Sequence, residues 1–332
     1  MFIAKSILPA LALPALALAG LALPAFADPL PSWNDGAAKT AIIDFVESVT
    51  DPASEQFVPE ADRIATFDND GTLWAEQPLY FQGLYALDVL KAKAETDPSI
   101  LDSDALKAAA AGDVDGVMAG GMEGLLSVLN VSHSGMTVED FQDDAAAWVS
   151  TATHPTKGMT YADMTYQPML ELLGYLRDEG FSTYIVSGGG VHFIRAISED
   201  AYGIPPQQVV GTEGNTKYEE LDGKPVLMKH GGVSFIDDKD GKPVGIDRHI
   251  GKRPIFVAGN SDGDFAMLEY AFAGEGPHFG LIVHHTDADR EFAYDRDSHV
   301  GALDRGLDEA AARGWLLVDM KNDWARVWSG GQ

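Results

Sequence analysis

The stretch that decides the fold is IATFDNDGTLW, residues 64–74. Its first four residues are mostly apolar and predict a short buried strand, and Asp68 and Asp70 follow at the point where that strand ends. Burying carboxylates is costly unless a partner or a metal ion compensates their charge. Two interpretations are open for this stretch alone: a polar turn built on Asn69, Asp70 and Gly71, or a catalytic pair of carboxylates.

The chain after this stretch alternates strands and helices. Strands are expected at 181–186, 254–259, 279–285 and 315–320. Such alternation predicts an α/β fold with a doubly wound, mostly parallel sheet that helices cover on both faces. In such sheets the ligand site lies off the carboxyl ends of the strands, and Asp68, Ser187 and Asn260 all take that position.

Residues 81–165 differ from the rest of the chain. They are rich in alanine and glycine, apolar positions recur through them, and no strong strand signal appears. We therefore predict a helical cap over 81–165, inserted into an α/β core formed by 28–80 and 166–332.

The N-terminal residues have the pattern of an export signal. Lys5 precedes an apolar run, and an A-x-A sequence ends at Ala27. This pattern predicts a secretory signal over 1–27 and a periplasmic or secreted protein with no stable membrane insertion after cleavage. An uncleaved anchor is the alternative, because the apolar run is long enough to span a bilayer.

The charge of the chain excludes some classes of partner. Its 332 residues include 51 acidic and 23 basic ones, for a formal net charge of −28. A protein this negative repels nucleic acid, and an anionic substrate would need a local cation at the site. The chain has no cysteine, which rules out a thiol nucleophile and a disulfide framework.

Three strand ends bring polar residues to one edge of the predicted sheet. The first brings Asp68 and Asp70, and the second brings Ser187 with three glycines before a helix, an arrangement that binds anions. The third, GNSDGD at 259–264, brings oxygen ligands suited to Mg²⁺, and Lys242 precedes it. Together these groups form a coherent set for phosphoryl transfer.

With these motifs the sequence resembles the haloacid dehalogenase superfamily of phosphohydrolases, in the phosphoserine-phosphatase-like branch with an inserted helical cap. FDNDGTL matches the first motif of that family, YIVSGGG the second, GKP with Lys242 the third, and AGNSDGDFAML the fourth. The resemblance implies a Rossmann-like core and a Mg²⁺-dependent acid phosphatase that hydrolyses small phosphorylated metabolites.

The resemblance also implies a role for each residue. Asp68 would be the nucleophile that forms an aspartyl-phosphate, and Asp70 would be the acid and base. The groups expected to contact the phosphoryl oxygens are Thr72, Ser187, Gly188 and Lys242. Lys252 competes with Lys242 for this role, although it lies closer to the fourth motif.

The fourth motif departs from the family pattern. The implied metal ligands are Asp68, the backbone carbonyl of Asp70, Asn260 and Asp264. Asp264 matches the last acid of the motif, but Asn260 stands where the family has its first acid. An amide oxygen can still bind Mg²⁺ with less charge, and Asp262 between them could supply the missing carboxylate.

Other interpretations remain open at this stage. A phosphotransferase or phosphomutase would use the same residues, and Asn260 alone suggests a non-catalytic protein that binds a phosphate ligand. Glu76 could attract a cationic group in a substrate pocket or pack at a domain hinge. A loop or supporting role is favoured for His284 and His285 over binding of substrate or metal. The sequence does not specify the natural substrate or the oligomeric state.

Overall fold

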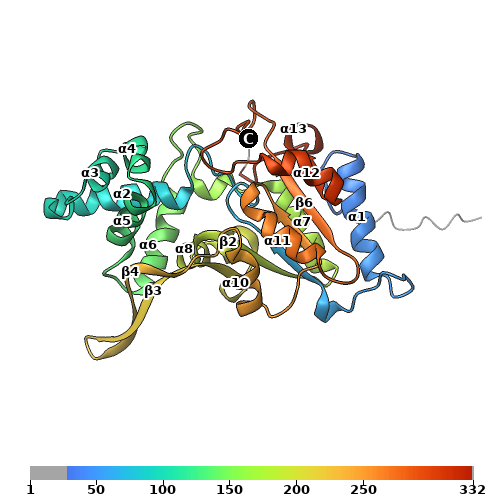
Figure 1. Cartoon of the computed structure of the whole chain (residues 1–332), viewed down its shortest axis with the longest axis horizontal. Helices are drawn as coiled ribbons and strands as arrows, with labels where there is room; N and C mark the ends of the chain where they lie inside the picture. The colour runs from blue at the N-terminus through green and yellow to red at the C-terminus, as the bar shows by residue number, and fades with distance from the viewer. Residues whose placement is uncertain (1–27, 331–332) are drawn as a thin grey trace, which may run out of the picture.

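The computed structural model of the chain describes residues 28–330, so the predicted signal at 1–27 lies outside the described residues. A seven-stranded sheet in the order β4-β3-β2-β1-β5-β6-β7 forms the centre of the molecule (Figure 1). Its strands are β1 Ile64–Phe67, β2 Ser182–Gly190, β3 Val209–Leu221, β4 Lys224–Phe235, β5 Phe256–Gly259, β6 Phe279–His284 and β7 Leu316–Asp319. Neighbouring strands pair in parallel except β3 and β4, which confirms the predicted α/β fold with a mostly parallel sheet.

Helices surround this sheet and also form a group at one side of it. Their bounds are α1 Ala37–Thr50, α2 Phe81–Thr96, α3 Asp104–Ala110, α4 Val114–Ala119, α5 Gly121–His133, α6 Val138–Thr151, α7 Gln167–Asp178, α8 Val191–Arg195, α9 Ser198–Tyr202, α10 Gly241–His249, α11 Phe265–Phe272, α12 Arg305–Arg313 and α13 Met320–Asp323. Among residues 28–330, no helix has both the length and the apolar character needed to cross a membrane.

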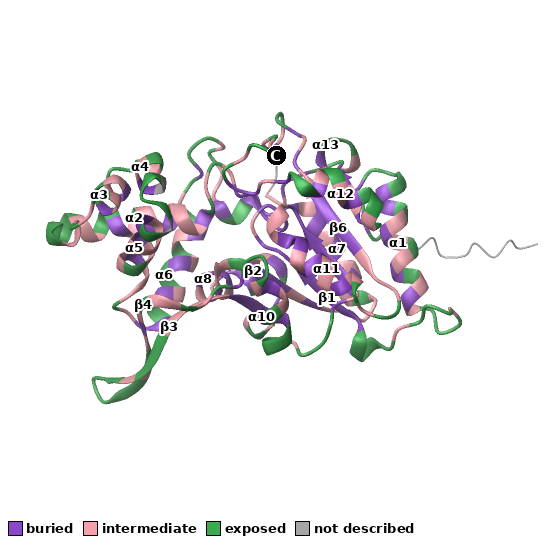
Figure 2. Ribbon diagram, viewed as in Figure 1, coloured by how far each residue is buried: buried purple, intermediate pink, exposed green. Residues whose placement is uncertain are grey.

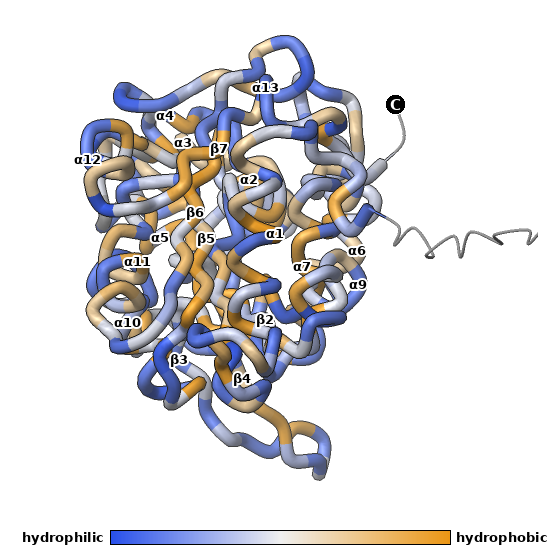
Figure 3. The backbone as a smooth tube through the Cα atoms, turned by 90° about the vertical axis from the view of Figure 1, so that its right-hand side faces the viewer, coloured by the Kyte–Doolittle hydropathy of each residue, from blue (hydrophilic) through white to orange (hydrophobic). Residues whose placement is uncertain are grey.

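The central strands are buried on both faces because successive side chains point to opposite sides. In β5, Phe256 and Ala258 belong to a core with helices α1 and α7, while Val257 belongs to a second core with α10 and α11. Figure 3 shows β5 and β6 as a largely hydrophobic path between the helices. The two cores hold the central strands in place, and with them the residues at the strand ends.

The strand order reverses direction at β1. The chain goes from β1 to β2 on one side, and β5 pairs with β1 on the other side. Ligands of such sheets bind where the order reverses, off the carboxyl ends of the strands. Asp68 follows β1 at that point, and its backbone N–H still donates to the Ala258 carbonyl of β5 at 2.9 Å.

The segment between β1 and β2 leaves the core and returns beside its own start. The Ala75 N–H donates to the Met164 carbonyl at 3.1 Å, and the Tyr166 N–H donates to the Leu73 carbonyl at 2.9 Å. Helices α2 to α5 pack around a small apolar cluster of their own and lie to the left in Figure 1. Helix α6 instead packs into the main core through Phe141. The boundaries of the cap at 81–165 stay a prediction.

A long hairpin, β3–β4, was not expected from the sequence. Asp222 and Gly223 turn the chain between its strands with φ angles of 51° and 77°. Much of its outer half is exposed, as Figure 2 shows in green. Its strand β4 contacts the inserted segment, where the Lys229 N–H donates to the Met136 carbonyl at 2.9 Å. The hairpin therefore forms part of the surroundings of the inserted helices.

Candidate active site

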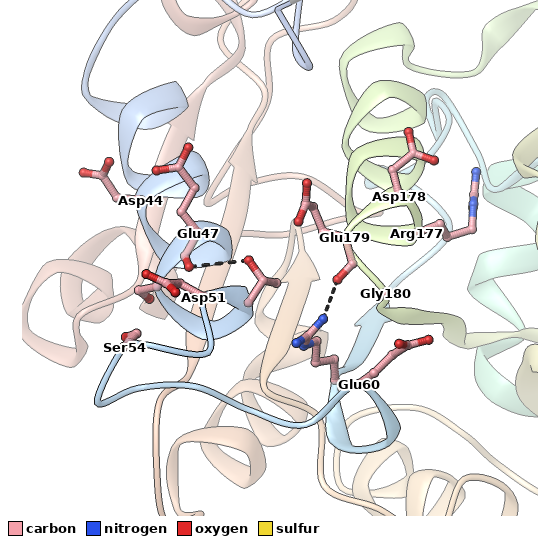
Figure 4. Close-up of a pocket in the computed structure, with 12 residues that line it drawn as sticks. Asp44, Glu47, Asp51, Ser54, Glu60, Arg177, Asp178, Glu179 and Gly180 are labelled. Atoms are coloured by element: carbon pink, nitrogen blue, oxygen red, sulfur yellow. Dashed lines mark hydrogen bonds between the residues drawn. The ribbon is translucent and has the colours of Figure 1, made fainter. Parts of the chain in front are cut away.

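Two hollows in the described part of the chain compete as the functional site. The larger, about 940 Å³, lies beside α1 and α7 at the amino ends of β1 and β2 (Figure 4). It is lined by surface acids such as Asp44 and Glu47, and Arg63 there donates to the Glu179 carbonyl at 2.8 Å. The other hollow, about 380 Å³, lies at the carboxyl ends of the strands and contains Asp68. Its position at the point where the strand order reverses makes it the candidate site.

The structure brings most of the predicted residues to this second pocket. Those that line it are Asp68, Asp70, Ser187, Gly188 and Lys242. The other three predicted residues, Thr72, Asn260 and Asp264, are buried and are not among the residues that line it. The Thr72 hydroxyl there donates to Asn260 Oδ1 at 3.3 Å.

Lys242 joins two of the acids at the floor of the pocket. Its Nζ donates to Asp68 Oδ1 at 2.7 Å, to Asp264 Oδ1 at 2.6 Å and to the Val186 carbonyl at 3.0 Å. These three bonds use all three protons of the ammonium group. They hold the Asp68 carboxylate in one orientation. Lys252 instead pairs with Asp62 on the surface, so the geometry favours Lys242 as the lysine of the site.

Burial shifts the titration of these groups. It raises the pKa of Asp68 to about 8, with Asp264 adding repulsion and Lys242 opposing the shift. Burial on its own lowers the pKa of a lysine, but Asp264 and Asp68 raise that of Lys242 above its ordinary value. The lysine therefore stays charged while it holds both acids.

Asp70 lies beside Asp68 with one oxygen held in place. Trp74 Nε1 donates to Asp70 Oδ1 at 2.9 Å, and burial raises the pKa of the Asp70 carboxyl. A Cβ on Gly189 would lie 3.5 Å from Asp70 Oδ2 and 3.3 Å from the Ser187 hydroxyl, so these two groups meet at that glycine. The Ser187 Oγ accepts the Gly189 N–H at 3.1 Å, which leaves its own proton free to donate to a ligand.

Glu76 is a third carboxylate at this pocket, and it is buried. Asn260 Nδ2 donates to Glu76 Oε1 at 2.7 Å, and the Tyr294 hydroxyl donates to the same oxygen at 2.8 Å. Burial raises the pKa of Glu76 well above its ordinary value, and Tyr294 opposes that shift. The sequence left a pocket role and a hinge role open for Glu76, and the structure places it in the pocket lining.

Gly71 makes room for this contact. Its φ is +72°, and a Cβ there would lie 2.0 Å from Asn260 Nδ2 and 2.5 Å from Glu76 Oε1. Only glycine satisfies both the backbone conformation and the lack of space. The turn interpretation of DNDG and the site interpretation are therefore compatible, because the turn lets Asn260 and Glu76 meet.

Asp262 lies in the fourth motif but serves a different element. Its Oδ2 accepts the Arg305 N–H at 2.9 Å and its Oδ1 accepts the Gly306 N–H at 3.0 Å, which caps the start of α12. A side chain engaged in this way is not available to complete a metal shell. Glu76, whose Oε1 accepts from Asn260 Nδ2 at 2.7 Å, is the carboxylate in direct contact with this position of the motif.

The donor set fits a hard divalent cation. Asp68, Asp70 and Glu76 line the same pocket, with Asp68 and Glu76 buried and Asp70 half-buried, and Lys242 is the only Lys or Arg among the described residues lining it. Within residues 28–330, no three acidic or histidine side chains already converge as a metal cage. A cation here would thus be held by one or two carboxylates with a backbone carbonyl, as Mg²⁺ commonly is.

Two supporting residues follow no motif in the sequence. Gln82 Oε1 accepts the Gly190 N–H at 2.7 Å, and its Nε2 lies 3.0 Å from His133 Nε2, so it ties α2 to the glycine turn. His285 Nε2 donates to the Gly71 carbonyl at 2.8 Å. His285 therefore supports the first-motif turn. The one sequence signal for the supporting role of Gln82 is its position shortly after the first motif.

The sequence and the fold were compared with families and structures of known proteins. A family model described as haloacid dehalogenase-like hydrolase matches residues 65–269. Among solved structures, the chain is similar to a conserved functionally unknown protein from Anaerococcus prevotii DSM 20548, at 16% identity and a TM-score of 0.49, covering 75% of this chain and 86% of that chain. It is also similar to a probable phosphoserine phosphatase from Vibrio cholerae, at 14% identity and a TM-score of 0.40, covering 82% of this chain and 64% of that chain. The curated proteins contain no match to this sequence.

Proposed function

The chain belongs to the haloacid dehalogenase-like hydrolases, and on that premise we propose that it is an exported, Mg²⁺-dependent phosphatase of small phosphate monoesters. The observation that carries the proposal is the Asp68 carboxylate, held by Lys242 at 2.7 Å on the floor of a pocket that also contains Asp70 and Ser187. Export rests on the signal pattern of residues 1–27.

The proposed reaction has two steps. An Asp68 oxygen attacks phosphorus and forms an aspartyl-phosphate, while the ester oxygen leaves and takes a proton from Asp70. Asp70, now a carboxylate, then accepts a proton from a water molecule, whose oxygen attacks phosphorus and releases phosphate and free Asp68. Ser187 and the adjacent backbone N–H groups donate to the phosphoryl oxygens, and Lys242 offsets negative charge.

The metal site of this proposal differs from the family pattern at two residues, Glu76 and Asp264. Asp68, the Asp70 backbone carbonyl and the pair formed by Asn260 and Glu76 would hold Mg²⁺. Asp264, which the family pattern also implies as a ligand, instead accepts hydrogen bonds from Lys242 Nζ and from the backbone N–H groups of Asn260 and Ser261. We infer that Glu76 supplies the carboxylate charge that Asn260 lacks, because the two side chains share a hydrogen bond of 2.7 Å. When bound, the cation supplies charge neutralisation for the phosphate group.

The experiment that tests the proposal is phosphate release from an aryl phosphate, with Mg²⁺ and with chelator. We expect turnover that the chelator abolishes and that Asp68→Asn reduces to background while the circular dichroism spectrum is unchanged. Asp44→Asn, in the larger hollow, is the matched control and should retain wild-type turnover. Turnover by Asp68→Asn at the wild-type rate would refute the proposed nucleophile.

A further inference from the structure

The pocket above the catalytic carboxylates has an aliphatic wall. Side chains from helices α2, α4 and α5 and from the end of the hairpin line it, among them Leu87, Val117, Leu126, Leu129, Val233 and Ile236. Val117 also belongs to the small apolar core of the inserted helices, so the wall of the pocket is continuous with that core. The end of the pocket farthest from the strands is therefore built from hydrocarbon.

The charges at the pocket disfavour a second anionic group on the ligand. Lys242 is the only Lys or Arg among the described lining residues, and Asp68, Asp264 and the Val186 carbonyl already accept its three protons. Glu76 and Asp238 line the same pocket. A carboxylate or a second phosphate on the ligand would thus meet further acids and no free Lys or Arg among the described lining residues, which costs binding energy.

Two of the polar side chains that line the pocket, Gln82 and Thr212, are already engaged. Gln82 is held between Gly190 and His133, and the Thr212 hydroxyl donates to the Gly188 carbonyl at 2.8 Å. The hydroxyl groups of a hydroxyl-rich ligand would lack hydrogen-bond partners against the aliphatic wall, and each unpaired group would lower the binding free energy. A hydrocarbon group gains free energy there as its surface leaves water.

We propose that the enzyme selects phosphate monoesters whose alcohol is an uncharged hydrocarbon, with the phosphate at Asp68 and the hydrocarbon against α4 and α5. This proposal rests on the proposed phosphatase function. The pocket volume of about 380 Å³ suits a small organic phosphate of this kind.

The first experiment measures kcat/KM for ethyl, butyl and hexyl phosphate, with phosphoserine as the comparison that carries a carboxylate. We expect kcat/KM to rise about fourfold for each added CH₂ until the pocket is filled. Hexyl phosphate should exceed phosphoserine. A flat alkyl series, or a preference for phosphoserine, would overturn the proposal.

A variant of the wall tests the location of the hydrocarbon. Ile236 is 57% exposed, so a lysine there should not disturb folding. Ile236→Lys should lower the preference for hexyl over ethyl phosphate about tenfold. Leu227→Lys is the matched control, since Leu227 is 45% exposed on β4 and does not line the pocket. An unchanged preference in Ile236→Lys would contradict the placement.

A binding measurement separates this proposal from the proposed reaction. Calorimetry with Asp68→Asn enzyme measures affinity for hexyl and ethyl phosphate without hydrolysis, and hexyl phosphate should bind at least tenfold more tightly. Absence of turnover by the wild-type enzyme together with this tighter binding would refute the phosphatase alone. Equal affinity for the two esters would refute the selectivity alone.

Discussion

Replacing Asn260 by aspartate gives the chain the acid that its family has at this position, yet we expect the change to be harmful. The Nδ2 of Asn260 donates to Glu76 Oε1 at 2.7 Å, and both side chains are 1% exposed. In Asn260→Asp a carboxylate oxygen would take the place of the donor. Without a metal ion, two buried acids would then face each other.

The size of the effect follows from this geometry. Burial raises the pKa of Glu76, so the lower limit is the loss of a buried hydrogen bond to the neutral acid, about 1–3 kcal/mol. Two charges 2.7 Å apart would repel by about 6 kcal/mol at an effective dielectric constant of 20, which sets the upper limit because either acid can protonate instead. We therefore expect Asn260→Asp to lower the free energy of unfolding by about 1–6 kcal/mol in the presence of chelator.

The assay is urea unfolding followed by tryptophan fluorescence, with chelator and with Mg²⁺. Added Mg²⁺ should recover much of the loss, because a cation between the acids turns repulsion into attraction. The double variant Glu76→Gln with Asn260→Asp exchanges the charge and the amide, and it should recover stability in chelator as well. Asp262→Asn is the control in the same loop; it weakens only a helix cap, which costs about 1 kcal/mol.

Two results would refute this reasoning. Asn260→Asp with wild-type stability in chelator would show that the side chain of Glu76 does not depend on a donor at residue 260. Additive effects in the double variant would show that the two residues do not act together. In either case Glu76 would not be the carboxylate that replaces the first acid of the fourth motif.

Three further changes give separate tests. Lys242→Met should lower the free energy of unfolding in urea by about 3–5 kcal/mol, because it leaves buried acids without their cation. Lys252→Met, in an exposed pair, should lower it by about 1 kcal/mol or less. Equal losses in the two variants would contradict the buried pairing of Lys242. Gly71→Ala should lower the free energy of unfolding by about 3 kcal/mol or more, because a Cβ there meets Asn260 Nδ2 at 2.0 Å. Gly276→Ala, with φ of +89° and open space around it, should lower it by about 1 kcal/mol. Similar melting temperatures for the two variants would refute the steric conflict at Gly71. Burial and two nearby lysines lower the pKa of His133 to about 3, so the unfolded chain takes up a proton below about pH 6.5 that the folded chain does not. Stability should therefore fall by about 1 kcal/mol between pH 7 and pH 5.5, and His133→Gln should reduce this fall by the same amount; the same pH dependence in both proteins would contradict a neutral buried imidazole.

The strands of the sheet could be predicted where each is a short apolar run in the sequence. The strands predicted around β1, β2, β5, β6 and β7 are all present, because a strand buried on both faces is a short apolar run. The hairpin β3–β4 was missed because only Val209, Val210 and Gly211 of β3 are buried and its remaining residues show no apolar alternation. One signal was present: Asp222-Gly223 is the dipeptide typical of a two-residue hairpin turn.

The candidate site could be predicted where residues follow strands. Asp68, Asp70, Ser187 and Lys242 follow or precede recognisable elements, and the fold brings them together. The contact between Glu76 and Asn260 could not be predicted, since it joins residues 184 positions apart through the turn at Gly71. Local pattern indicated only that a carboxylate was missing from the fourth motif, and the nearest acid in sequence, Asp262, caps a helix instead.

The central claim is that Asp68 carries the phosphoryl group during the reaction. The most direct test mixes enzyme with hexyl phosphate and Mg²⁺, quenches with acid during turnover, and maps the phosphorylated peptide by mass spectrometry. We predict one added phosphoryl group on the peptide that contains IATFDNDGTLW, with the modification at Asp68 and none in Asp68→Asn enzyme. A phosphoryl group found on another residue of the wild-type enzyme would contradict the claim. Phosphate release by the Asp68→Asn enzyme at the wild-type rate would contradict it as well.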